Sequence, residues 1–499
     1  MTGTDVLALL PELVLVLLVL LVLTVDLFLG REQKWVLTLI TVGGLLLVGV
    51  ACWEEWGVNL TVFAGFYRVD DLSVFFKVAT VVIGILSALF APSYLKQRRL
   101  PLGEFNVILL FSLTGMFVLA SASDLITLFI GLELMVMPAY LLAGFAKTDR
   151  YSNEGGLKYF LLGSFASAIL LFGISWTYGL TGSTRISEIG GLVSGGGAAG
   201  LIAISMLTVA ATFKVAAVPF HYWTPDAYQG APTPITGFLS VGPKLGAFAL
   251  LVRLFAEGLG ASGADWFGAM AILAVLTMTG GNIVALAQSN VKRMLAYSSI
   301  AHSGYIIAAL AAFAHASGQT LIVNGSHGVA DPGLVARGEA IQSILFYVLG
   351  YGVMNIAAFS VVGMLQRDPR RFGGLAGFAG LAGRAPALAA AMAILLLSLT
   401  GIPPTVGFFA KLYVLVATVD AGVAWLAVAI ALNAALAAFY YLRVIVYMYM
   451  REPESDPAPI DTSPLTAFAL AISVAGVLLL GIFPDPVITF LRASAASLF

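Results

Sequence analysis

The chain has 499 residues, of which 60% are hydrophobic and only 10% are charged, and its mean hydropathy is +0.99. This composition excludes a soluble globular domain and is typical of an integral membrane protein. The formal net charge of -1 provides no basic surface for nucleic acid. Cys52 is the only cysteine, so an internal disulfide and a cysteine-ligated iron–sulfur cluster held by this chain alone are excluded.

The predicted elements are membrane-spanning helices, because apolar segments of about 20 residues or more recur along the whole chain. The first segment carries Glu12 and Asp26 and lacks the basic start of a signal peptide, so we expect it to be retained. The fourteen predicted spans lie near residues 6–29, 36–53, 72–95, 104–121, 124–146, 155–180, 199–218, 234–256, 266–288, 293–313, 340–365, 385–418, 422–449 and 464–491.

Lysine and arginine gather in the loops on one side of these spans. These residues are Arg31, Lys34, Lys96, Arg98, Arg99, Lys147, Arg150, Lys292, Arg293, Arg367, Arg370 and Arg371. The positive-inside rule therefore predicts that these loops are cytoplasmic and that both termini are extracytoplasmic. The segment 314–339 is predicted to be a long outside loop on the solvated surface, and we assign it no chemistry.

Two spans are interrupted by proline close to a lysine. The first interruption follows Lys214, at Pro219 in FKVAAVPFHYWTP, and the second is at Pro403 and Pro404 in SLTGIPPTVGFFAKLY, before Lys411. Interrupted helices at matching places are typical of transporters built from inverted repeats. The spacing predicts an all-α polytopic membrane protein with two inverted five-helix repeats and two broken helices. Its predicted units are 1–103, 104–258, 259–450 and 451–499.

Charged side chains within the spans are candidate functional residues, because a charge near the bilayer centre costs about 2.5–3.5 kcal/mol on insertion scales. Lys214, Lys244 and Lys411 lie inside apolar sequence, and Glu133 lies in the middle of LITLFIGLELMVMPAYLLAG. A carboxylate near an ammonium would keep both groups charged. We interpret these four residues as a proton-transfer set, the alternative being ion pairs that only hold helices together.

Three further residues are weaker candidates. His221 follows the first interruption and titrates in a range suited to proton relay, although a satisfied hydrogen-bonding role is nearly as plausible. His302, in YSSIAHSGY, could link the two halves. Lys158, in GLKYFLLG, could equally extend to the membrane surface. Lys77, Arg253 and Arg443 lie near span ends and are interpreted as structural or lipid-facing, and the histidines lack metal-ligand spacing.

Four stretches together resemble one known family. FKVAAVPFHYWTPDAYQGAPTPITGFLSVGPK, GLKYFLLGSFASAILLFG, NVKRMLAYSSIAHSGY and GIPPTVGFFAKLYV are similar to the N-subunit family of the respiratory NADH:quinone oxidoreductases, complex I. The resemblance covers nearly the whole chain. It implies a fourteen-helix antiporter-like subunit that carries protons through Glu133, Lys214, Lys244 and Lys411 along a hydrated axis. Lys158 and His221 also match positions that the family uses.

The resemblance also implies where the chain works and what surrounds it. NADH, flavin, iron–sulfur clusters and quinone are expected in partner subunits, and no cofactor or metal is expected on this chain. The expected partners are an adjacent antiporter-like subunit and small membrane subunits of complex I, within a bacterial inner membrane. One departure from the family is that the tenth span offers His302 where a second membrane glutamate would correspond to Glu133. A complete independent channel in each half is therefore doubtful.

The expected mechanism is electrostatic proton transfer. Protons are expected to enter from the cytoplasm through the first half, to reach Lys244 by way of Lys214, and to leave through the second half past Lys411. Glu133 is expected to stabilise protonated Lys214. Two alternatives stay open at the sequence level: a subunit of a multisubunit cation/proton antiporter or membrane-bound hydrogenase, and a scaffold whose charges only hold helices together.

Overall fold

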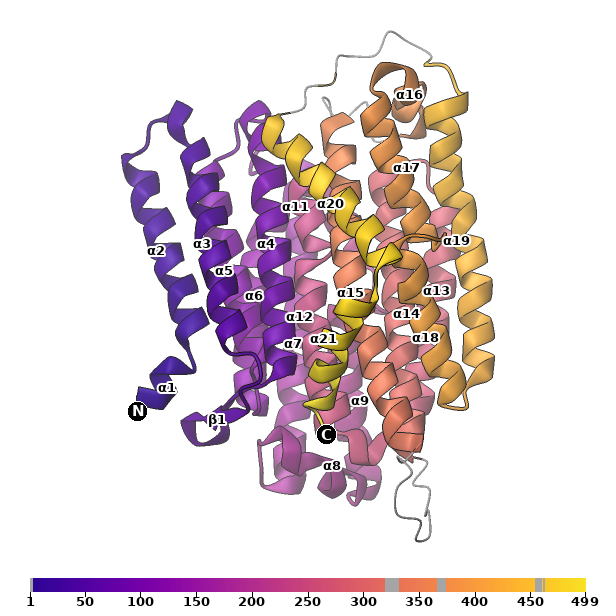
Figure 1. Cartoon of the computed structure of the whole chain (residues 1–499). Coiled ribbons are helices and arrows are strands. Elements are labelled where there is room, and N and C mark those ends of the chain that lie inside the picture. The colour runs from indigo at the N-terminus through magenta and orange to yellow at the C-terminus, as the bar shows by residue number, and fades with distance from the viewer. Residues whose placement is uncertain (1–2, 319–331, 366–373, 454–459, 461–462) are drawn as a thin grey trace.

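The chain folds into a bundle of long, roughly parallel helices, as a computed structural model shows (Figure 1). The structure describes residues 3–318, 332–365, 374–453, 460 and 463–499. The first helices are α1 (Gly3–Leu7), α2 (Leu10–Phe28), α3 (Trp35–Glu54), α4 (Asp71–Gln97), α5 (Leu102–Ala120), α6 (Leu125–Ala143), α7 (Arg150–Thr181), α8 (Ile186–Ser194), α9 (Gly197–Lys214), α10 (Trp223–Gly230), α11 (Thr233–Leu239) and α12 (Gly242–Leu251).

The remaining helices follow a π-helical segment, η3 (Val252–Gly258), which continues α12. They are α13 (Gly263–Leu286), α14 (Val291–Gly318), α15 (Pro332–Leu365), α16 (Leu381–Arg384), α17 (Pro386–Thr400), α18 (Val406–Asp420), α19 (Ala424–Met450), α20 (Pro464–Ile482) and α21 (Asp485–Ala496). Short 3-10 turns lie at Arg31–Gln33, Phe63–Gly65, Gly260–Ser262 and Leu375–Phe378. Two strands, β1 (Leu60–Val62) and β2 (Tyr67–Val69), form an antiparallel hairpin.

The predicted all-α membrane fold is confirmed. Within the described ranges, thirteen helices are long and apolar enough to cross a membrane, and the broken pair α17 and α18 occupies the place of the predicted twelfth span. Helices suit this environment because they satisfy every backbone polar group internally, which lipid cannot do. The inverted repeats and the four predicted units stay predictions.

Two predicted boundaries are wrong. The outside loop 314–339 was expected to be irregular, but its described ends are helical, since α14 continues to Gly318 and α15 begins at Pro332; residues 319–331 lie outside the described residues. The last span ends at Ile482, and the separate helix α21 follows it. Hydropathy marks where a helix meets lipid, whereas helical hydrogen bonding continues into water, so hydropathy alone misplaces such ends.

The interior and the periphery of the bundle differ in burial. In the span Thr233–Gly258, every residue of the most apolar 18-residue segment is buried, and in α14 and α15 the buried share of that segment is 94%. In α2 and α20 the buried share is only 33%. The most protected helices are therefore those that carry Lys244 and His302, so these side chains lie in the centre of the protein rather than against lipid.

The β1–β2 hairpin and the start of α4 are hydrogen-bonded to the C-terminal end of the chain. The guanidinium of Arg68 in β2 donates to the carbonyl of Ser497 at 3.0 Å, and the Leu72 backbone N–H donates to the Ser497 hydroxyl at 3.3 Å. Figure 1 shows α20 and α21 crossing the bundle obliquely in front of α15. The two chain ends lie at the same end of the bundle, as an even number of crossings requires.

Candidate functional site

Each of the three membrane lysines predicted from the sequence lies beside an interruption in a helix. Lys214 is the last residue of α9, and Lys411 lies on α18 just after the interruption that follows α17. Lys244 lies in the first turn of α12, because the span breaks at Ser240 and Val241. The sequence analysis did not predict this third break. A helix end leaves backbone carbonyl groups unpaired, and Lys411 uses those of α17, whereas the partners of Lys214 and Lys244 come from α7 and α14.

In the first half, Lys214 and Glu133 are joined through a hydroxyl group. Lys214 Nζ donates to Ser167 Oγ at 2.9 Å, and the Ser167 hydroxyl donates to Glu133 Oε1 in a short hydrogen bond. The Gly163 carbonyl lies 3.4 Å from the same ammonium. The expected glutamate–lysine association is therefore present as a bridged pair across α6, α7 and α9, and not as a direct contact.

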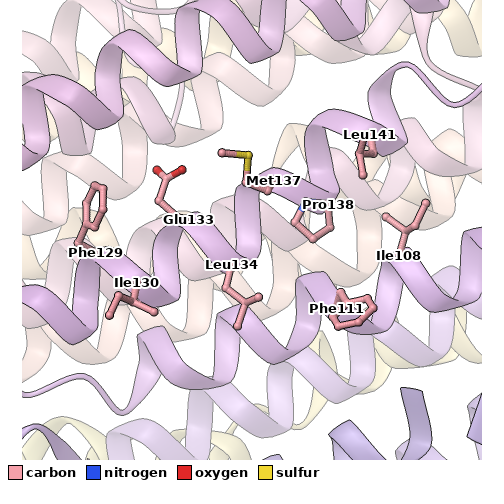
Figure 2. A pocket seen from close by; sticks show the side chains of 9 residues that line it. All are labelled: Ile108, Phe111, Phe129, Ile130, Glu133, Leu134, Met137, Pro138 and Leu141. Atoms are coloured by element: carbon pink, nitrogen blue, oxygen red, sulfur yellow. The ribbon is translucent and has the colours of Figure 1, made fainter. Parts of the chain in front are cut away.

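Glu133 also faces an open groove. The groove has a volume of about 480 Å³, and apart from Glu133 it is lined by apolar residues of α5 and α6: Ile108, Phe111, Phe129, Ile130, Leu134, Met137, Pro138 and Leu141. Figure 2 shows the Glu133 carboxylate on the side of α6 away from Leu134 and Phe111. Glu133 is only half-buried, and Met137 and Phe111 are exposed. Glu133 therefore borders an apolar groove, while its carboxylate is hydrogen-bonded by Ser167 of α7.

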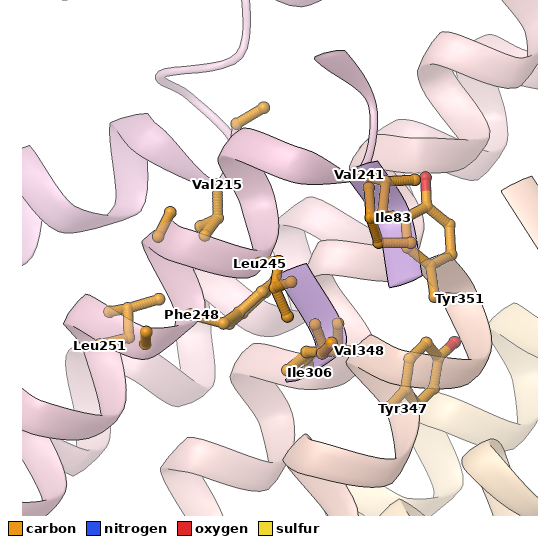
Figure 3. Close-up of a cluster of buried hydrophobic side chains, with 14 of the residues drawn as sticks. Ile83, Val215, Val241, Leu245, Phe248, Leu251, Ile306, Tyr347, Val348 and Tyr351 are labelled. Atoms are coloured by element: carbon orange, nitrogen blue, oxygen red, sulfur yellow. The ribbon is translucent and has the colours of Figure 1, made fainter. Parts of the chain in front are cut away.

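Lys244 lies at the centre of the protein and is bound by α14. Its ammonium donates to Ser299 Oγ and to the Ser299 carbonyl, each at 2.6 Å, and to Ser303 Oγ at 2.9 Å. These contacts use all three ammonium donors. The side chains next to Lys244 along the chain, Val241, Leu245 and Phe248, belong to a cluster of buried apolar residues (Figure 3). Within the described residues, Lys244 therefore has hydroxyl and carbonyl partners but no carboxylate partner.

His302 lies on the same face of α14 as the two serines that bind Lys244. Its Nδ1 is 2.8 Å from the Tyr347 hydroxyl and its Nε2 is 3.2 Å from the Tyr441 hydroxyl. The imidazole is 2% exposed, and its tyrosine partners come from α15 and α19. A role for His302 as a link between the two halves stays a prediction.

In the second half, Lys411 binds the end of the preceding half-helix. Its ammonium donates to the carbonyls of Leu399 and Thr400 at 2.9 and 2.6 Å. These are the last carbonyls of α17, where the helix dipole favours a positive charge. The ring of Tyr305 lies 5.3 Å from the same ammonium, within range of a cation–π contact.

Lys158 belongs to a different cluster. It pairs with Glu154 and with Asp226, each at 2.7 Å, and Asp226 also accepts from Arg293 at 2.9 Å. Burial, the largest influence, acts to raise the pKa of Asp226, but the hydrogen bonds from Lys158 and Arg293 outweigh it and lower that pKa. Asp226 therefore ties α7 to α14 at one end of the bundle, and Lys158 is 42% exposed there.

Among the described residues, His221 makes no hydrogen bond or ion pair with the membrane lysines or with Lys158. It is half-buried in the interruption after α9 and stacks against Tyr222. Its buried Nδ1 has no hydrogen-bond partner within the described part of the chain. The structure therefore does not join His221 to the other candidates.

Several polar residues at the site were missed by the sequence analysis. Ser167, Ser299 and Ser303 bind the lysines, but single serines in apolar helices are too common to stand out. Lys292 was interpreted as a loop residue; it is 5% exposed and donates to the carbonyls of Gln229 and Ala231 at 3.2 and 2.7 Å. The end of α10 thus binds a lysine in the same way as the end of α17.

The residues set aside as structural or lipid-facing are not lipid-facing. Lys77 and Arg253 are 0% and 1% exposed, and each is bound by carboxylates. Arg443 donates to the carbonyls of Leu286 and Gln288. Charged groups are costly to bury without partners, and the partners come from helices that are distant in sequence. Among the described residues, no group of three or more His, Cys, Asp or Glu side chains could hold a metal ion.

The fold and these buried lysines are features of an antiporter-like membrane subunit, and a family comparison agrees. The family described as "NADH:quinone oxidoreductase/Mrp antiporter, TM" matches residues 122–336 and 325–437. A chain of respiratory complex I from Thermus thermophilus has a TM-score of 0.79 and 31% identity, with 97% of this chain and 99% of that chain covered. A chain of the Mrp complex from Dietzia has a TM-score of 0.79 but 21% identity, with 100% and 98% covered, and shows the fold alone.

Curated relatives define the family more closely. The NADH-quinone oxidoreductase subunit N of Trichlorobacter lovleyi is 40% identical over 96% of this chain and 95% of its own length. The subunit N of Chloroflexus aggregans is 39% identical over 98% of this chain and 97% of its own length. The chain belongs to the NADH-quinone oxidoreductase subunit N family. This result favours the complex I interpretation over the antiporter and hydrogenase alternatives.

Proposed function

We propose that the chain translocates protons as a membrane-arm subunit of an NADH:quinone oxidoreductase, using Glu133, Lys214, Lys244 and Lys411 as its proton-carrying or charge-switching groups. The observation that carries this proposal is that three buried lysines each lie at a helix interruption and bind hydroxyl or carbonyl oxygens. Hydroxyl and carbonyl oxygens accept a hydrogen bond from the ammonium but carry no charge of their own. A lysine that they bind can therefore lose its proton without leaving an unpaired buried carboxylate in direct contact with it.

The proposed route begins at Lys214 and reaches Lys411 through Lys244. Glu133 acts through Ser167 to favour the protonated form of Lys214. The proton next passes to Lys244, and ordered water is the expected carrier between the two. His302, with its two tyrosine partners, spans the region between Lys244 and Lys411. Lys158 and His221 stay secondary candidates, with Lys158 near one end of the bundle.

The subunit itself is proposed to carry out no redox chemistry. NADH, flavin, iron–sulfur clusters and quinone would bind partner subunits, and quinone reduction there would drive proton movement here. The sequence supports this division because its lone cysteine is buried in α3 and it contains no dinucleotide-binding fingerprint. The enzyme activity therefore belongs to the whole complex.

The groove beside Glu133 supports a partner within the membrane. A carboxylate close to lipid would be costly, whereas a neighbouring subunit could cover the apolar groove that Glu133 borders and exclude lipid from the charge. We assign this face to a membrane-arm partner, either the adjacent antiporter-like subunit or a small subunit. A charge change in that partner would then act directly on Glu133.

The proposed location is the bacterial inner membrane, with both termini extracytoplasmic. Lys147 and Arg185 flank α7 on opposite sides, and both are exposed. With Cys52→Ala as background, Lys147→Cys should react with an impermeant thiol reagent only from the cytoplasm and Arg185→Cys only from outside. Labelling of both from one side would contradict the proposed orientation. Arg370, Arg371 and Gly325, the sequence-based choices for this test, lie outside the described residues.

The central experiment replaces Lys244 with arginine in the complete complex. Arginine can occupy the same place as the lysine, but its guanidinium stays protonated and so cannot release a proton during the transport cycle. Lys244→Arg should assemble but lower proton translocation at least about tenfold, equivalent to about 1.4 kcal/mol in the barrier. Translocation and quinone reduction are measured together in proteoliposomes, with assembly checked on a native gel. Lys96→Arg, at an exposed surface pair, is the matched control and should translocate normally. Normal translocation by Lys244→Arg would refute the carrier role.

A further inference from the structure

A second buried charge cluster lies outside the proposed proton route, at the end of the bundle that carries the β1–β2 hairpin. It joins Glu12 of α2, Glu55 at the end of α3, Tyr67 of β2 and Lys77 of α4. All four residues are at least nine-tenths buried. Cys52, in α3, is a further titratable group close to Lys77. The cluster therefore brings together four separate elements and holds two carboxyl groups against a single ammonium.

The hydrogen-bond donors of this cluster are all used. Lys77 Nζ donates to Glu12 Oε1 and Glu55 Oε2, each at 2.9 Å, and to the Tyr67 hydroxyl at 3.1 Å. An ammonium has three donors, so none is left. The Tyr67 hydroxyl donates to Glu12 Oε1 in a short hydrogen bond. The other oxygen of each carboxyl group, Glu12 Oε2 and Glu55 Oε1, is buried and has no hydrogen-bond partner among the described residues.

The charge of the cluster does not balance if both carboxyl groups are ionised. Two carboxylates and one ammonium leave a net negative charge in a dry site, which is costly to bury. One added proton removes this charge, because it converts a carboxylate to a carboxylic acid and leaves one carboxylate for Lys77. Two carboxyl groups sharing a site behave in this way, with one proton bound at a pH where isolated carboxyls have lost theirs.

Glu55 is the member of the cluster that is closest along the chain to a run of exposed residues. This residue follows the last residue of α3, and Gly57, Val58 and Asn59 beyond it are exposed. Burial raises the pKa of Glu55 to about 7, although Lys77 acts to lower it. A raised carboxyl pKa means that the proton is held below that pH and released above it. Glu55 is therefore the group through which a proton would exchange with the aqueous phase.

We propose that Glu12, Glu55, Lys77 and Tyr67 form a proton-binding site that holds one proton between two carboxyl groups and exchanges it with water at the hairpin end of the bundle. Uptake forms one O–H bond on a carboxylate oxygen, and release returns that proton to water. Lys77 stays protonated throughout, because one carboxylate always faces it. If the cluster were instead a set of ion pairs that only holds the helices together, it would bind no exchangeable proton near neutral pH.

The test uses the whole complex and infrared spectroscopy, so its result is independent of turnover and of the proposed proton route. Difference spectra of the membrane-reconstituted complex are recorded between about pH 5.5 and pH 8.5, a range in which ordinary glutamates are already ionised. The wild type should show loss of a protonated-carboxyl band as the pH rises. Glu55→Gln should lack the contribution of one such group, because Glu12 and Lys77 then balance each other as carboxylate and ammonium.

Two variants complete the experiment. Glu12→Gln should remove the same contribution for the same reason, and it keeps the site testable if Glu55→Gln does not assemble. Glu54→Gln changes the exposed neighbour of Glu55 and should leave the band unchanged. Equal spectra for wild type, Glu55→Gln and Glu12→Gln would overturn the proposal. A double variant, Glu12→Gln with Glu55→Gln, lacks both carboxyl groups. If the wild-type spectrum is identical to the spectrum of this double variant, the proposal is also overturned.

Discussion

The two halves of the bundle hold their lysines by different means. Lys214 in the first half is linked through Ser167 to the carboxylate of Glu133, whereas Lys411 in the second half binds the backbone carbonyls of Leu399 and Thr400. A carboxylate can be screened or neutralised by a neighbour, but a backbone carbonyl keeps its dipole. The comparison suggests that the first lysine responds to charge and the second responds to the geometry of its helix end.

This difference assigns distinct tasks to the two sites. The charge-sensitive site also includes Glu133, which borders the groove proposed to contact a partner. The carbonyl-bound site is buried to a similar degree, since Lys411 and Lys214 are 6% and 5% exposed, and the ring of Tyr305 lies beside the Lys411 ammonium. Coupling to the rest of the complex would thus enter through the first half, and the second half would follow it.

The largest expected effect comes from removing the charge of Glu133. Glu133→Gln keeps nearly the same volume and its hydrogen-bonding ability, so the complex should assemble. It removes the negative charge that favours protonated Lys214, and proton translocation should fall at least about tenfold. Glu133→Asp keeps the charge with a shorter reach and should give an intermediate value. Translocation is measured beside quinone reduction in proteoliposomes.

Two outcomes would count against this difference between the halves. If Glu133→Gln assembles and translocates like the wild type, Glu133 is at most structural. If both substitutions remove the complex from the membrane, Glu133 acts mainly to hold α6 against its neighbours.

A smaller effect is expected from the hydroxyl that bridges Glu133 and Lys214. Ser167→Ala removes one hydrogen bond from each partner, and a typical net hydrogen bond is worth about 0.5–1.5 kcal/mol. Translocation should therefore fall about two- to tenfold, with the larger loss if the bridge carries the interaction. Ser303→Ala, which removes one of three contacts to Lys244, is the matched variant. A loss for Ser303→Ala that exceeds the loss for Ser167→Ala would reverse the proposed order of importance.

The smallest expected effect concerns Asp226, which ties the first half to the second through Lys158 and Arg293. Its pKa is lowered in the folded protein, so its contribution to stability is present above the ordinary aspartate pKa of about 3.9 and is lost as the pH falls through the lowered value. Asp226→Asn should destabilise the complex by about 0–1 kcal/mol, because the cluster is partly exposed. The difference in thermal inactivation from wild type should be constant between about pH 8 and pH 5 and should shrink below about pH 4. A difference that grows on acidification would contradict this sign.

The sequence was sufficient to predict the membrane-spanning helices because hydropathy is a local property, whereas the inverted repeats stay a prediction. The long apolar helices and the interruptions at Pro219 and Pro403 follow from the composition of each segment. The break at Ser240 and Val241 was missed, since neither residue is a typical helix breaker and the adjacent Gly242 and Pro243 can begin a helix. Two helix ends were also misplaced: the end of α14 was predicted too early along the chain and the start of α15 too late.

The partners of each charge could not be predicted, because they come from distant segments. Ser299 lies 55 residues from the Lys244 that it binds, and Ser167 lies 47 residues from Lys214. Lys77 was set aside because it lies near a span end, and its two carboxylates come from α2 and the end of α3. Position along a span indicates depth in the membrane, but it does not reveal which side chains converge there.

The contacts of Ser497 with the β1–β2 hairpin bear on biogenesis. Arg68 and Ser497 are 429 residues apart, yet the Arg68 guanidinium donates a hydrogen bond to the Ser497 carbonyl. Segments emerge from the ribosome and enter the membrane in order, so α2 to α4 must wait for almost the whole chain to be synthesised before α21 packs against α4. During that interval the Arg68 end of the bundle lacks one of its final contacts. A quality-control protease that acts at this side of the membrane would therefore find chains that end before α21 to be its most accessible substrates.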